Sequence, residues 1–564
     1  MTDRAEWLPA STPEHASALE SPGIPAWMAE LLARRGVADA AEAARFLNPS
    51  LDHLHDPFLL AGLDEAADRL VLARDAGEAV AIVGDYDVDG VSATALLLAV
   101  LRACGLTAHE ILPHRLKEGY GFQPVHVEKA VELGCSVIVT VDCGVSSTDA
   151  IDAASEREVD VIITDHHLPG EELPPSAVLV NPRQEGCEYP FPDLAGVGLA
   201  FKLALGVAER CGRQVPIEAL LRIACLGTIA DLVPLTGENR VIAALGLAEL
   251  GRTPSPGLQA LFKVAGIKPP FDASDVGFRI GPRLNAAGRL DDAASALELL
   301  LARDRRRAQQ LAEELDRWNR SRQAEERRVF EEALERLRQR DPLPAIAVAW
   351  DATWHKGVLG IAAGRIAREL HRPTLLLAEE EDRAVGSGRS VPGIEIHRFL
   401  SAWQERLTRF GGHAQAVGMT VPLAALADLR AEWEAKAEED WPEDLLRPRH
   451  RYELELPTEA VDGSFLARLE ALEPFGQSNS RPLLRVGPME LVGAPRIFGK
   501  ENDHLSAVAR GEDGGRLELI GWRWRDRKGE LETAFEALGY LERDRYRNGP
   551  VLRLIDVRPA AFHG

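Results

Sequence analysis

Aspartate and histidine side chains occur at three places in the chain with spacings that suit metal coordination. At the first place aspartates stand at every second position, and like charges so close repel one another unless a cation or a proton offsets them. At the third place two histidines directly follow an aspartate. Oxygen and imidazole donors without a thiolate favour manganese, magnesium or cobalt over structural zinc. The residues are Asp85, Asp87 and Asp89, then Asp142, then Asp165, His166 and His167.

Each of these motifs also has a simpler structural interpretation. The Asp-rich motif can be a hydrophilic turn, and an aspartate at a strand end, such as Asp142, is commonly a helix N-cap. An EF-hand loop is excluded, because the sixth residue after Gly90 is Leu96 where that loop needs a glutamate. Caps do not account for three strand ends of this kind, so we interpret the motifs as one metal site, with room for two metals that share a carboxylate.

Apolar, β-branched segments directly precede the three motifs, at residues 79–84, 136–141 and 159–164. Continuous Val/Ile runs are typical of parallel strands buried on both faces. Helical patterns alternate with them over about 78–235, which predicts a doubly wound parallel sheet. The carboxyl ends of such strands meet at one edge, so the motifs should converge there. If strand geometry continues through the first motif, its three aspartates leave on the same side.

One further acid, Asp231, is the lone charge in the apolar run 226–235. A charge in such surroundings is seldom left unpaired.

The length of 564 residues predicts several domains. We expect an N-terminal helical cap over 1–75, a catalytic α/β domain over 76–300 and a long connecting helix over 301–342. A second α/β domain over 343–446 and a small OB-like β-barrel over 447–564 should follow, because short alternating segments with Gly and Asn replace the helical pattern there.

The composition limits the class of protein. A net charge of −23 argues against a protein that coats nucleic acid or membrane by bulk charge, although a locally basic groove remains compatible with it. The six cysteines include no CxxC pair, so free thiols are favoured over disulfides or a zinc site. Without a signal-like N-terminus or a long apolar run, the sequence predicts a soluble, cytoplasmic protein with no membrane contact.

The motifs taken together resemble the DHH phosphoesterase superfamily. The resemblance rests on Asp87-Val88-Asp89-Gly90, Asp142, Asp165-His166-His167 and Thr228-Ile229-Ala230-Asp231 in this order. Further segments resemble the bacterial RecJ family of single-strand-specific 5′ to 3′ exonucleases, and they cover about 78–480. These segments are residues 112–121, 195–202, 282–289, 386–390, 411–413 and 473–476. One departure is Ser478, where the family pattern leads us to expect glycine.

The resemblance implies roles for individual residues. Asp89, Asp142, His166 and Asp231 would bind one metal, and Asp87 with Asp142, assisted by Asp85, would bind the second, with Mn²⁺ or Mg²⁺ as the ions. Asp142 and His167 would be catalytic. His167 would face the scissile phosphate; the alternative is that its imidazole supports a metal ligand.

A second set of residues is expected to bind DNA. Gly386-Ser387-Gly388-Arg389-Ser390 offers amides, hydroxyls and a guanidinium for a terminal phosphate, unless it is only a glycine turn with surface arginines. Trp522 and Trp524 alternate with arginines; on a strand both would share one face and either stack on bases or belong to the core. The expected DNA-binding residues are Arg115, Tyr120, Arg289, Ser387, Arg389, His413, Trp522 and Trp524.

The function expected from this resemblance is two-metal hydrolysis of single-stranded DNA from the 5′ end, in DNA recombination and repair. The alternatives are a DHH-type phosphodiesterase of short oligonucleotides or cyclic dinucleotides, an inorganic pyrophosphatase, and a catalytically silent scaffold that binds single strands. A single-strand-binding protein and a helicase are the expected protein partners of a monomer.

Overall fold

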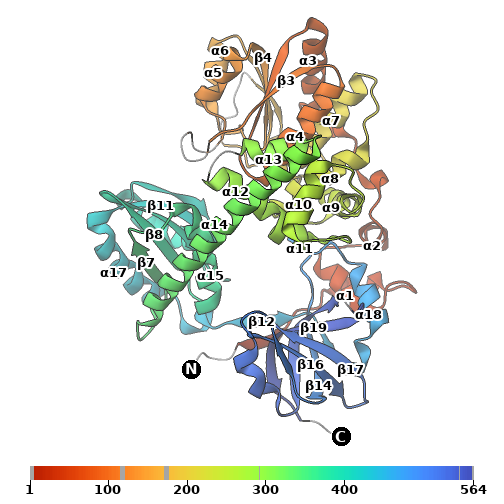
Figure 1. Ribbon diagram of the computed structural model, residues 1–564, viewed down its shortest axis with the longest axis vertical. Helices are drawn as coiled ribbons and strands as arrows, with labels where there is room; N and C mark the ends of the chain where they lie inside the picture. Colours follow the sequence, from red (N-terminus) through yellow and green to blue (C-terminus); the bar gives the residue numbers. More distant parts are fainter. Residues whose placement is uncertain are drawn as a thin grey trace. The chain divides into compact units, whose positions relative to one another are not determined.

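The structure, a computed structural model, describes residues 5–114, 118, 121–170, 177–290, 293–544 and 547–561, and for residues 289 and 290 the backbone alone. The chain forms two compact units (Figure 1). The smaller unit joins Met1–Trp7 to Asp316–His450, and the larger joins Leu8–Leu315 to Arg451–Gly564. Each unit is described by itself.

The larger unit contains the predicted parallel sheet, with the strand order β3-β2-β4-β5-β6. The chain runs from β2 out to the edge strand β3 and returns to β4 on the other side of β2, so the order reverses between β2 and β4. Open α/β sheets bind ligands beyond the carboxyl ends of the strands at such a switch point. The strands are β2 (Ala79–Gly84), β3 (Thr107–Ile111), β4 (Cys135–Val141), β5 (Asp160–Thr164) and β6 (Ala177–Val180).

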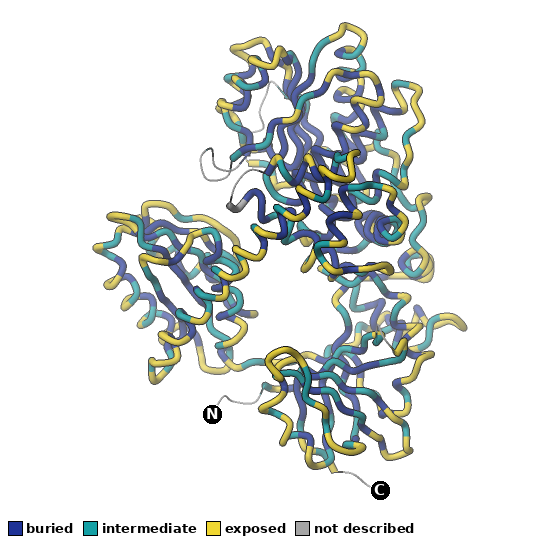
Figure 2. The backbone as a smooth tube through the Cα atoms, in the orientation of Figure 1, coloured by how far each residue is buried: buried dark blue, intermediate teal, exposed yellow. Residues whose placement is uncertain are grey.

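Helices cover both faces of this sheet, so β2, β4 and β5 are almost wholly buried (Figure 2), which is why these strands are rich in Val and Ile. One face carries α5 (Pro124–Glu132) and α6 (Thr148–Glu156). The other carries α3 (Leu63–Ala76), α4 (Val88–Ala103) and α7 (Gly196–Arg210) (Figure 1). Nearly every residue of α4 is buried, so the start of this helix is held firmly beside the sheet edge. Next along the chain are α8 (Ile217–Ala230) and α9 (Gly237–Leu250).

The C-terminal part of the larger unit is a closed β-structure. Strands β14, β18, β19, β17 and β16 pair in that order, and β14 also pairs with β16, which closes the circle. Helices α1 (Ala26–Arg34) and α2 (Ala40–Leu47) share a hydrophobic core with these strands. The five strands are β14 (Leu483–Leu491), β16 (His504–Gly511), β17 (Arg516–Gly521), β18 (Phe535–Arg543) and β19 (Pro550–Pro559).

The smaller unit is built on a mixed sheet with the order β10-β11-β9-β8-β7, in which only β7 and β8 are parallel. Its strands are β7 (Ala347–Asp351), β8 (Thr374–Glu380), β9 (Arg383–Arg389), β10 (Arg409–His413) and β11 (Ala416–Pro422). Residues of α15 (Leu359–Leu370) and of α14 pack on one face, and α16 (Ile396–Leu400) and α17 (Leu423–Asp440) pack on the other.

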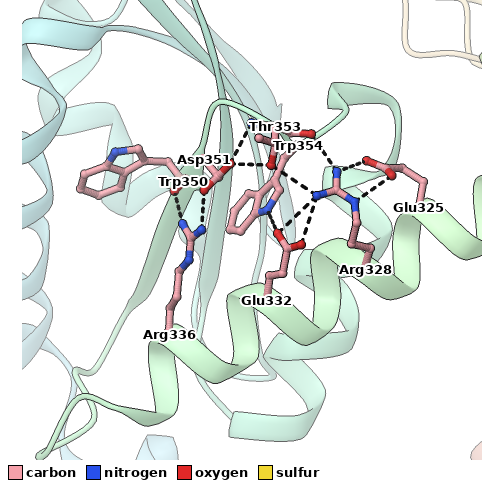
Figure 3. A network of polar contacts seen from close by, with 8 residues as sticks. All are labelled: Glu325, Arg328, Glu332, Arg336, Trp350, Asp351, Thr353 and Trp354. Carbon is pink, nitrogen blue, oxygen red and sulfur yellow. Dashed lines mark hydrogen bonds and ion pairs between the residues drawn. The ribbon is translucent and has the colours of Figure 1, made fainter.

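A single helix, α14 (Arg305–Arg338), occupies the range where the sequence predicts a long helix. A polar network fixes its C-terminal half to the sheet of the smaller unit (Figure 3). Arg336 donates to the backbone oxygen of Trp350 at 2.9 Å and pairs with Asp351, while the indole of buried Trp354 donates to Glu332 at 2.8 Å. This end of the helix therefore belongs rigidly to the smaller unit.

Among the described residues, no helix is both long enough and apolar enough to span a membrane.

Candidate active site

The acidic motifs meet at the switch point of the parallel sheet, as the sequence predicts. Asp85 directly follows β2 and Asp142 directly follows β4, the two strands between which the order reverses. Both side chains are buried, at 4% and 3% exposure. The backbone of Asp142 turns sharply here, with φ of +62°, and its N–H donates to the oxygen of Thr164 at the end of β5. These side chains therefore line one edge of the sheet.

The prediction that strand geometry continues through the first motif is wrong. Strand β2 ends at Gly84, and Asp87 is the N-cap of α4, where its carboxylate accepts from the N–H groups of Asp89 and Gly90. Asp89 lies in the first helical turn. The three aspartates therefore leave from a strand end, a helix N-cap and a first helical turn rather than from one strand face.

Asp89 is held by the start of helix α7. Its two carboxylate oxygens accept from the N–H groups of Gly196 at 2.7 Å and Val197 at 2.9 Å, at a helix end that favours negative charge. The backbones pass so closely that side chains do not fit: a Cβ on Gly196 would lie 2.5 Å from the Cβ of Asp142, and one on Gly227 would lie 2.4 Å from Oδ1 of Asp89. Glycine at these positions makes the cluster possible.

His166 joins this cluster to Asp231, which caps the C-terminus of α8. Nε2 of His166 lies 3.2 Å from Oδ1 of Asp142 and 3.6 Å from Oδ2 of Asp231. Nε2 of His166 and Oδ1 of Asp142 are both buried, yet neither makes a hydrogen bond within the described part of the chain. Buried polar atoms rarely stay unpaired, so their convergence fits a bound cation.

The pKa values reflect an excess of negative charge. Burial, then Asp231 and Asp87, raise the pKa of Asp89 well above its ordinary value, and burial with Asp89 does the same for Asp142. Burial and the charge of Asp87 raise the pKa of Asp231 to about 7. Burial and nearby His167 lower the pKa of His166 to about 4, so its imidazole is neutral at pH 7 and can ligate a metal.

His167 has a different environment from His166. Its Nδ1 lies 2.7 Å from Oδ1 of Asp165, and this hydrogen bond raises the pKa of the imidazole. Burial is the largest single effect on Asp165 and would raise its pKa, but the hydrogen bond and charge of His167 and the backbone N–H groups of Val145 and His167 together lower it. Asp165 also accepts from the N–H of Val145, and Asn181 donates to the backbone oxygen of His167. The imidazole of His167 is about half exposed and is fixed in orientation by these contacts. Its raised pKa favours the cationic form.

Three sets of ligand atoms in this cluster, each within 4.8 Å of one another, can hold a metal ion: Asp89, His166 and Asp231; Asp85, Asp87 and Asp142; and Asp142, His166 and His167. Asp142 belongs to two of the sets, which suits a carboxylate shared by two ions. We call Asp85, Asp87, Asp89, Asp142, His166 and Asp231 the carboxylate edge. Its oxygen-rich donors suit Mn²⁺ or Mg²⁺.

Two of the predicted DNA-binding residues on the larger unit, Arg115 and Tyr120, lie outside the described residues, and so does the side chain of Arg289. Their positions relative to the carboxylate edge therefore stay predictions.

Ser387 and Arg389 do come together, on the smaller unit. They are alternate residues of strand β9, and Arg389 donates to Oγ of Ser387 at 3.1 Å. The alternative of a glycine turn is wrong, because β8 and β11 pair with β9 on both sides, and for the same reason the amides of β9 are engaged in the sheet. A second source of amides lies nearby: a Cβ on Gly360, at the start of α15, would lie 2.8 Å from the Arg389 guanidinium.

Among the described residues no carboxylate pairs with Arg389, and burial lowers the pKa of its guanidinium. In register, Arg389 pairs with Ala416, and Ala416 pairs with His413. Directly paired residues point to the same face of a sheet, so His413 shares the face of Arg389 two strands away. We call Ser387, Arg389 and the α15 N-terminus at Gly360 the Arg389 site.

Trp522 and Trp524 do not lie on one strand face, and that prediction is wrong. Strand β17 ends at Gly521, and Arg523 takes a left-handed conformation with φ of +61° between the two tryptophans. Trp522 is 49% exposed and contacts His504 and Phe498 edge-on. Trp524 is buried in the core under the guanidinium of Arg527, so it is unavailable for stacking on bases.

Sequence reasoning missed three consecutive polar residues that are buried at the start of α9, namely Glu238, Asn239 and Arg240. Their only sequence signal is their position shortly after Asp231, before an apolar helix.

Comparison with known proteins gives three matching domain models in chain order. A model of the DHH family, N-terminal domain, matches residues 79–228. A DHHA1 domain model matches 343–439, and a RecJ OB domain model matches 452–555. The matches include the carboxylate edge as far as His166 and the whole Arg389 site.

Two curated relatives are both named single-stranded-DNA-specific exonuclease RecJ. The protein from Bacillus subtilis (strain 168) is 38% identical over 509 residues, which are 90% of this chain and 63% of that protein. The protein from Dickeya dadantii (strain 3937) is 39% identical over 440 residues, or 73% of this chain and 76% of that protein. The chain therefore spans less than two thirds of the Bacillus relative and about three quarters of the Dickeya one.

Solved structures include RecJ in complex with Mn²⁺ from Thermus thermophilus, with a TM-score of 0.82 and 31% identity. That similarity covers all of this chain and 81% of the other. The Mg²⁺ complex of the Thermus protein is also similar, with a TM-score of 0.76.

Proposed function

Since this chain belongs to the RecJ family of single-stranded-DNA-specific exonucleases, we propose that it removes mononucleotides from the 5′ end of single-stranded DNA in a metal-dependent reaction, in DNA recombination and repair. The observation that carries the proposal is the carboxylate edge. It gathers more buried negative charge than its hydrogen bonds offset, at the ligand-binding point of the sheet.

The residues of this edge fit two divalent ions. Asp89, His166 and Asp231 with Asp142 would hold one, and Asp87, Asp142 and Asp85 the other. When bound, such ions activate water and offset charge on the phosphoryl oxygens. The chain itself keeps His166 neutral and fixes Asp89 through the amides of α7, so both ligands are held in place, and a bound cation would offset the raised pKa of Asp89.

His167 is the proposed phosphate contact. Asp165 holds Nδ1 of His167 and so orients the ring, and Nε2 would donate to an oxygen of the scissile phosphate. The raised pKa of His167 favours the protonated imidazole, which suits a developing negative charge.

The Arg389 site is the proposed receptor for the 5′ phosphate. A guanidinium that no described carboxylate neutralises, a hydroxyl and a helix N-terminus are three donors that bind phosphate well. A terminal phosphate carries more charge than an internal one, so these donors favour the end of a strand. Arg115, Tyr120, Arg289 and His413 are proposed as further DNA contacts, and Trp522 as a stacking platform.

The alternative of a phosphodiesterase for short oligonucleotides or cyclic dinucleotides is less well supported. It leaves unexplained the match to the RecJ OB domain model over 452–555. A closed β-structure of this class typically binds single strands several nucleotides long.

Partners and location are proposed as follows. Single-stranded DNA is the substrate, a single-strand-binding protein and a helicase are the protein partners, and the chain acts as a monomer. All six cysteines are free, which suits a reducing compartment, and we propose the cytoplasm.

The test is the order of product release from a single strand labelled at its 5′ end, in Mn²⁺. Labelled mononucleotide should appear first and duplex DNA should resist. Release that begins at the 3′ end would contradict the polarity, and turnover that survives chelation of divalent ions would contradict the metal requirement.

A further inference from the structure

Helix α9 begins with three buried polar residues that the proposed reaction does not use. Glu238, Asn239 and Arg240 are 1%, 0% and 2% exposed, in the first turn after the loop that carries Asp231. Polar groups buried in this way normally satisfy other buried polar groups. We call these three residues the α9 hub.

Asn239 connects the loop that follows Asp231 to the segment whose amides hold Asp89. Its Nδ2 donates to the backbone oxygen of Pro234 at 3.1 Å and to that of Asp193 at 2.5 Å. Pro234 is three residues after Asp231, and Asp193 is three residues before Gly196, whose N–H holds Asp89. One side-chain amide therefore links the loop of one proposed ligand to the helix end that orients another.

The flanking hub residues anchor this link. Glu238 accepts from Nζ of the fully buried Lys202, two turns along α7, at 2.5 Å, and from the hydroxyl of Tyr189 at 2.6 Å. Arg240 donates to the backbone oxygens of Leu472 at 3.0 Å and Glu473 at 2.7 Å. The first turn of α9 is thus fixed both to α7 and to the segment that begins Glu473-Pro474-Phe475-Gly476.

The loop between Asp231 and α9 needs such support, because it has no regular structure of its own. Leu232 has φ of +62°, an uncommon conformation for a leucine, and its side chain is 69% exposed. Leu235 donates through its N–H to the oxygen of Gln477, and a Cβ on Gly476 would lie 2.5 Å from Leu235. Ser478 continues this segment in a left-handed conformation, φ +58°, which glycine adopts more readily than serine, and this fits the expectation of glycine there.

We infer that Asn239 is a positioning residue for the metal site. By holding the oxygens of Asp193 and Pro234 together, it keeps Asp231 and the amides that bind Asp89 at the separation that the metal ligands require. In the described structure both hydrogen bonds of the Asn239 amide go to these two backbone oxygens, and its Oδ1, although buried, makes none. The inference rests on the proposed metal-dependent function.

The test is Mn²⁺ binding to the full chain without DNA, followed by electron paramagnetic resonance of the free ion. Asn239→Ala should weaken Mn²⁺ binding by about 10- to 100-fold, the range found when residues that support metal ligands are removed. Turnover should recover substantially at saturating Mn²⁺, since no ligand is lost. Asn239→Ser, which retains a shorter donor, should have an intermediate affinity.

Asn479→Ala is the matched control. Asn479 is also fully buried, and its Nδ2 also donates to two backbone oxygens, those of Leu472 and Pro474, but both lie on one segment that carries no proposed ligand and no amide bound to one. Its loss should reduce thermal stability as much as the loss of Asn239 while leaving Mn²⁺ affinity within about twofold. Equal weakening in both variants, or normal affinity in Asn239→Ala, overturns the inference.

If neither Asn239 variant folds, hydrogen exchange of the natural chain decides. Added Mn²⁺ should slow exchange in 193–197 and 232–236 to the same extent, because Asn239 links them; protection of 232–236 alone overturns the inference. A natural chain that binds no Mn²⁺ would contradict the proposed function instead, so the two failures are distinguishable.

Discussion

The carboxylate edge and the Arg389 site differ in the sign of the charge that each leaves unbalanced. At the carboxylate edge, several aspartates lie close together near the start of helix α7. Burial and the repulsion between them raise the pKa values of Asp89 and Asp142. At the second, a half-buried guanidinium has a serine and a carbonyl as its partners, and burial lowers its pKa. Each site is electrostatically incomplete, and each would be completed by an ion of opposite charge.

The comparison also shows how two sheets prepare different ligand sites. The parallel sheet gathers side chains at the ends of its strands, so residues distant in sequence meet at one edge. The mixed sheet presents Ser387 and Arg389 from within one strand, towards the start of a helix. The first arrangement suits chemistry that needs many ligands, and the second suits recognition of a single group.

The largest expected effect comes from the carboxylate edge. Asp142→Ala should reduce hydrolysis by about 10³-fold or more, because Asp142 belongs to two of the ligand sets. Binding of a 5′-phosphorylated oligonucleotide should stay nearly unchanged. Asp152→Ala, which removes an exposed carboxylate of α6, is the control and should act like the natural protein. Retained turnover in Asp142→Ala would contradict a shared ligand.

A smaller effect is expected at the Arg389 site. Arg389→Gln should lower kcat/KM on 5′-phosphorylated single strands by about 10- to 100-fold, the value of one or two charge-assisted hydrogen bonds. It should also remove the preference over a 5′-hydroxyl end. Arg383→Gln, at the exposed start of the same strand, is the matched control. If Arg389→Gln retained the preference, the phosphate would have another receptor.

Of the two sites, the carboxylate edge is the one that lower pH should affect, because it should weaken metal binding there. With the pKa of Asp231 at about 7, Mn²⁺ must displace a proton below that pH, so affinity should fall about tenfold per pH unit there. Without metal the sign for stability is opposite. A carboxyl whose pKa is raised on folding stabilises the fold below its unfolded pKa of about 4 and loses that contribution as pH rises to about 7. The melting temperature of the protein in EDTA should therefore be lower at alkaline than at mildly acidic pH. Calorimetry measures this difference.

The smallest effect is expected where contact does not depend on charge. Trp522→Ala should weaken binding of long single strands by about 5- to 10-fold without changing stability, as for the loss of one stacked base. Trp524→Ala is the contrasting variant, because loss of a buried tryptophan should cost about 3–5 kcal/mol of unfolding free energy. Fluorescence anisotropy and thermal melts separate the two outcomes.

The sequence predicted most of the carboxylate edge because its signals are local. Each Val/Ile run with an aspartate behind it identifies both a buried parallel strand and the residue at its end. Asp231 stood out as the lone charge in an apolar segment. The glycines, serines and arginine of 386–390 likewise identified Ser387 and Arg389 as a pair of phosphate-binding candidates. Their location within a β-strand was not predicted.

What the sequence left open depends on contacts between distant segments. The amides of Gly196 and Val197 donate to Asp89, which lies more than one hundred residues earlier in the sequence. No local sequence pattern near either position predicts these hydrogen bonds. The alternation of Trp522 and Trp524 suggested a strand, but the chain turns at Arg523, so one ring is exposed and the other buried. The α9 hub was missed for the same reason, since its partners lie on several segments that are distant in sequence.

The most direct test of the two-metal site is the anomalous scattering of manganese in crystals of this chain grown with Mn²⁺. The account predicts two peaks that share Asp142, one beside Asp89, His166 and Asp231 and the other beside Asp85 and Asp87. A single peak, or peaks remote from Asp142, would contradict it.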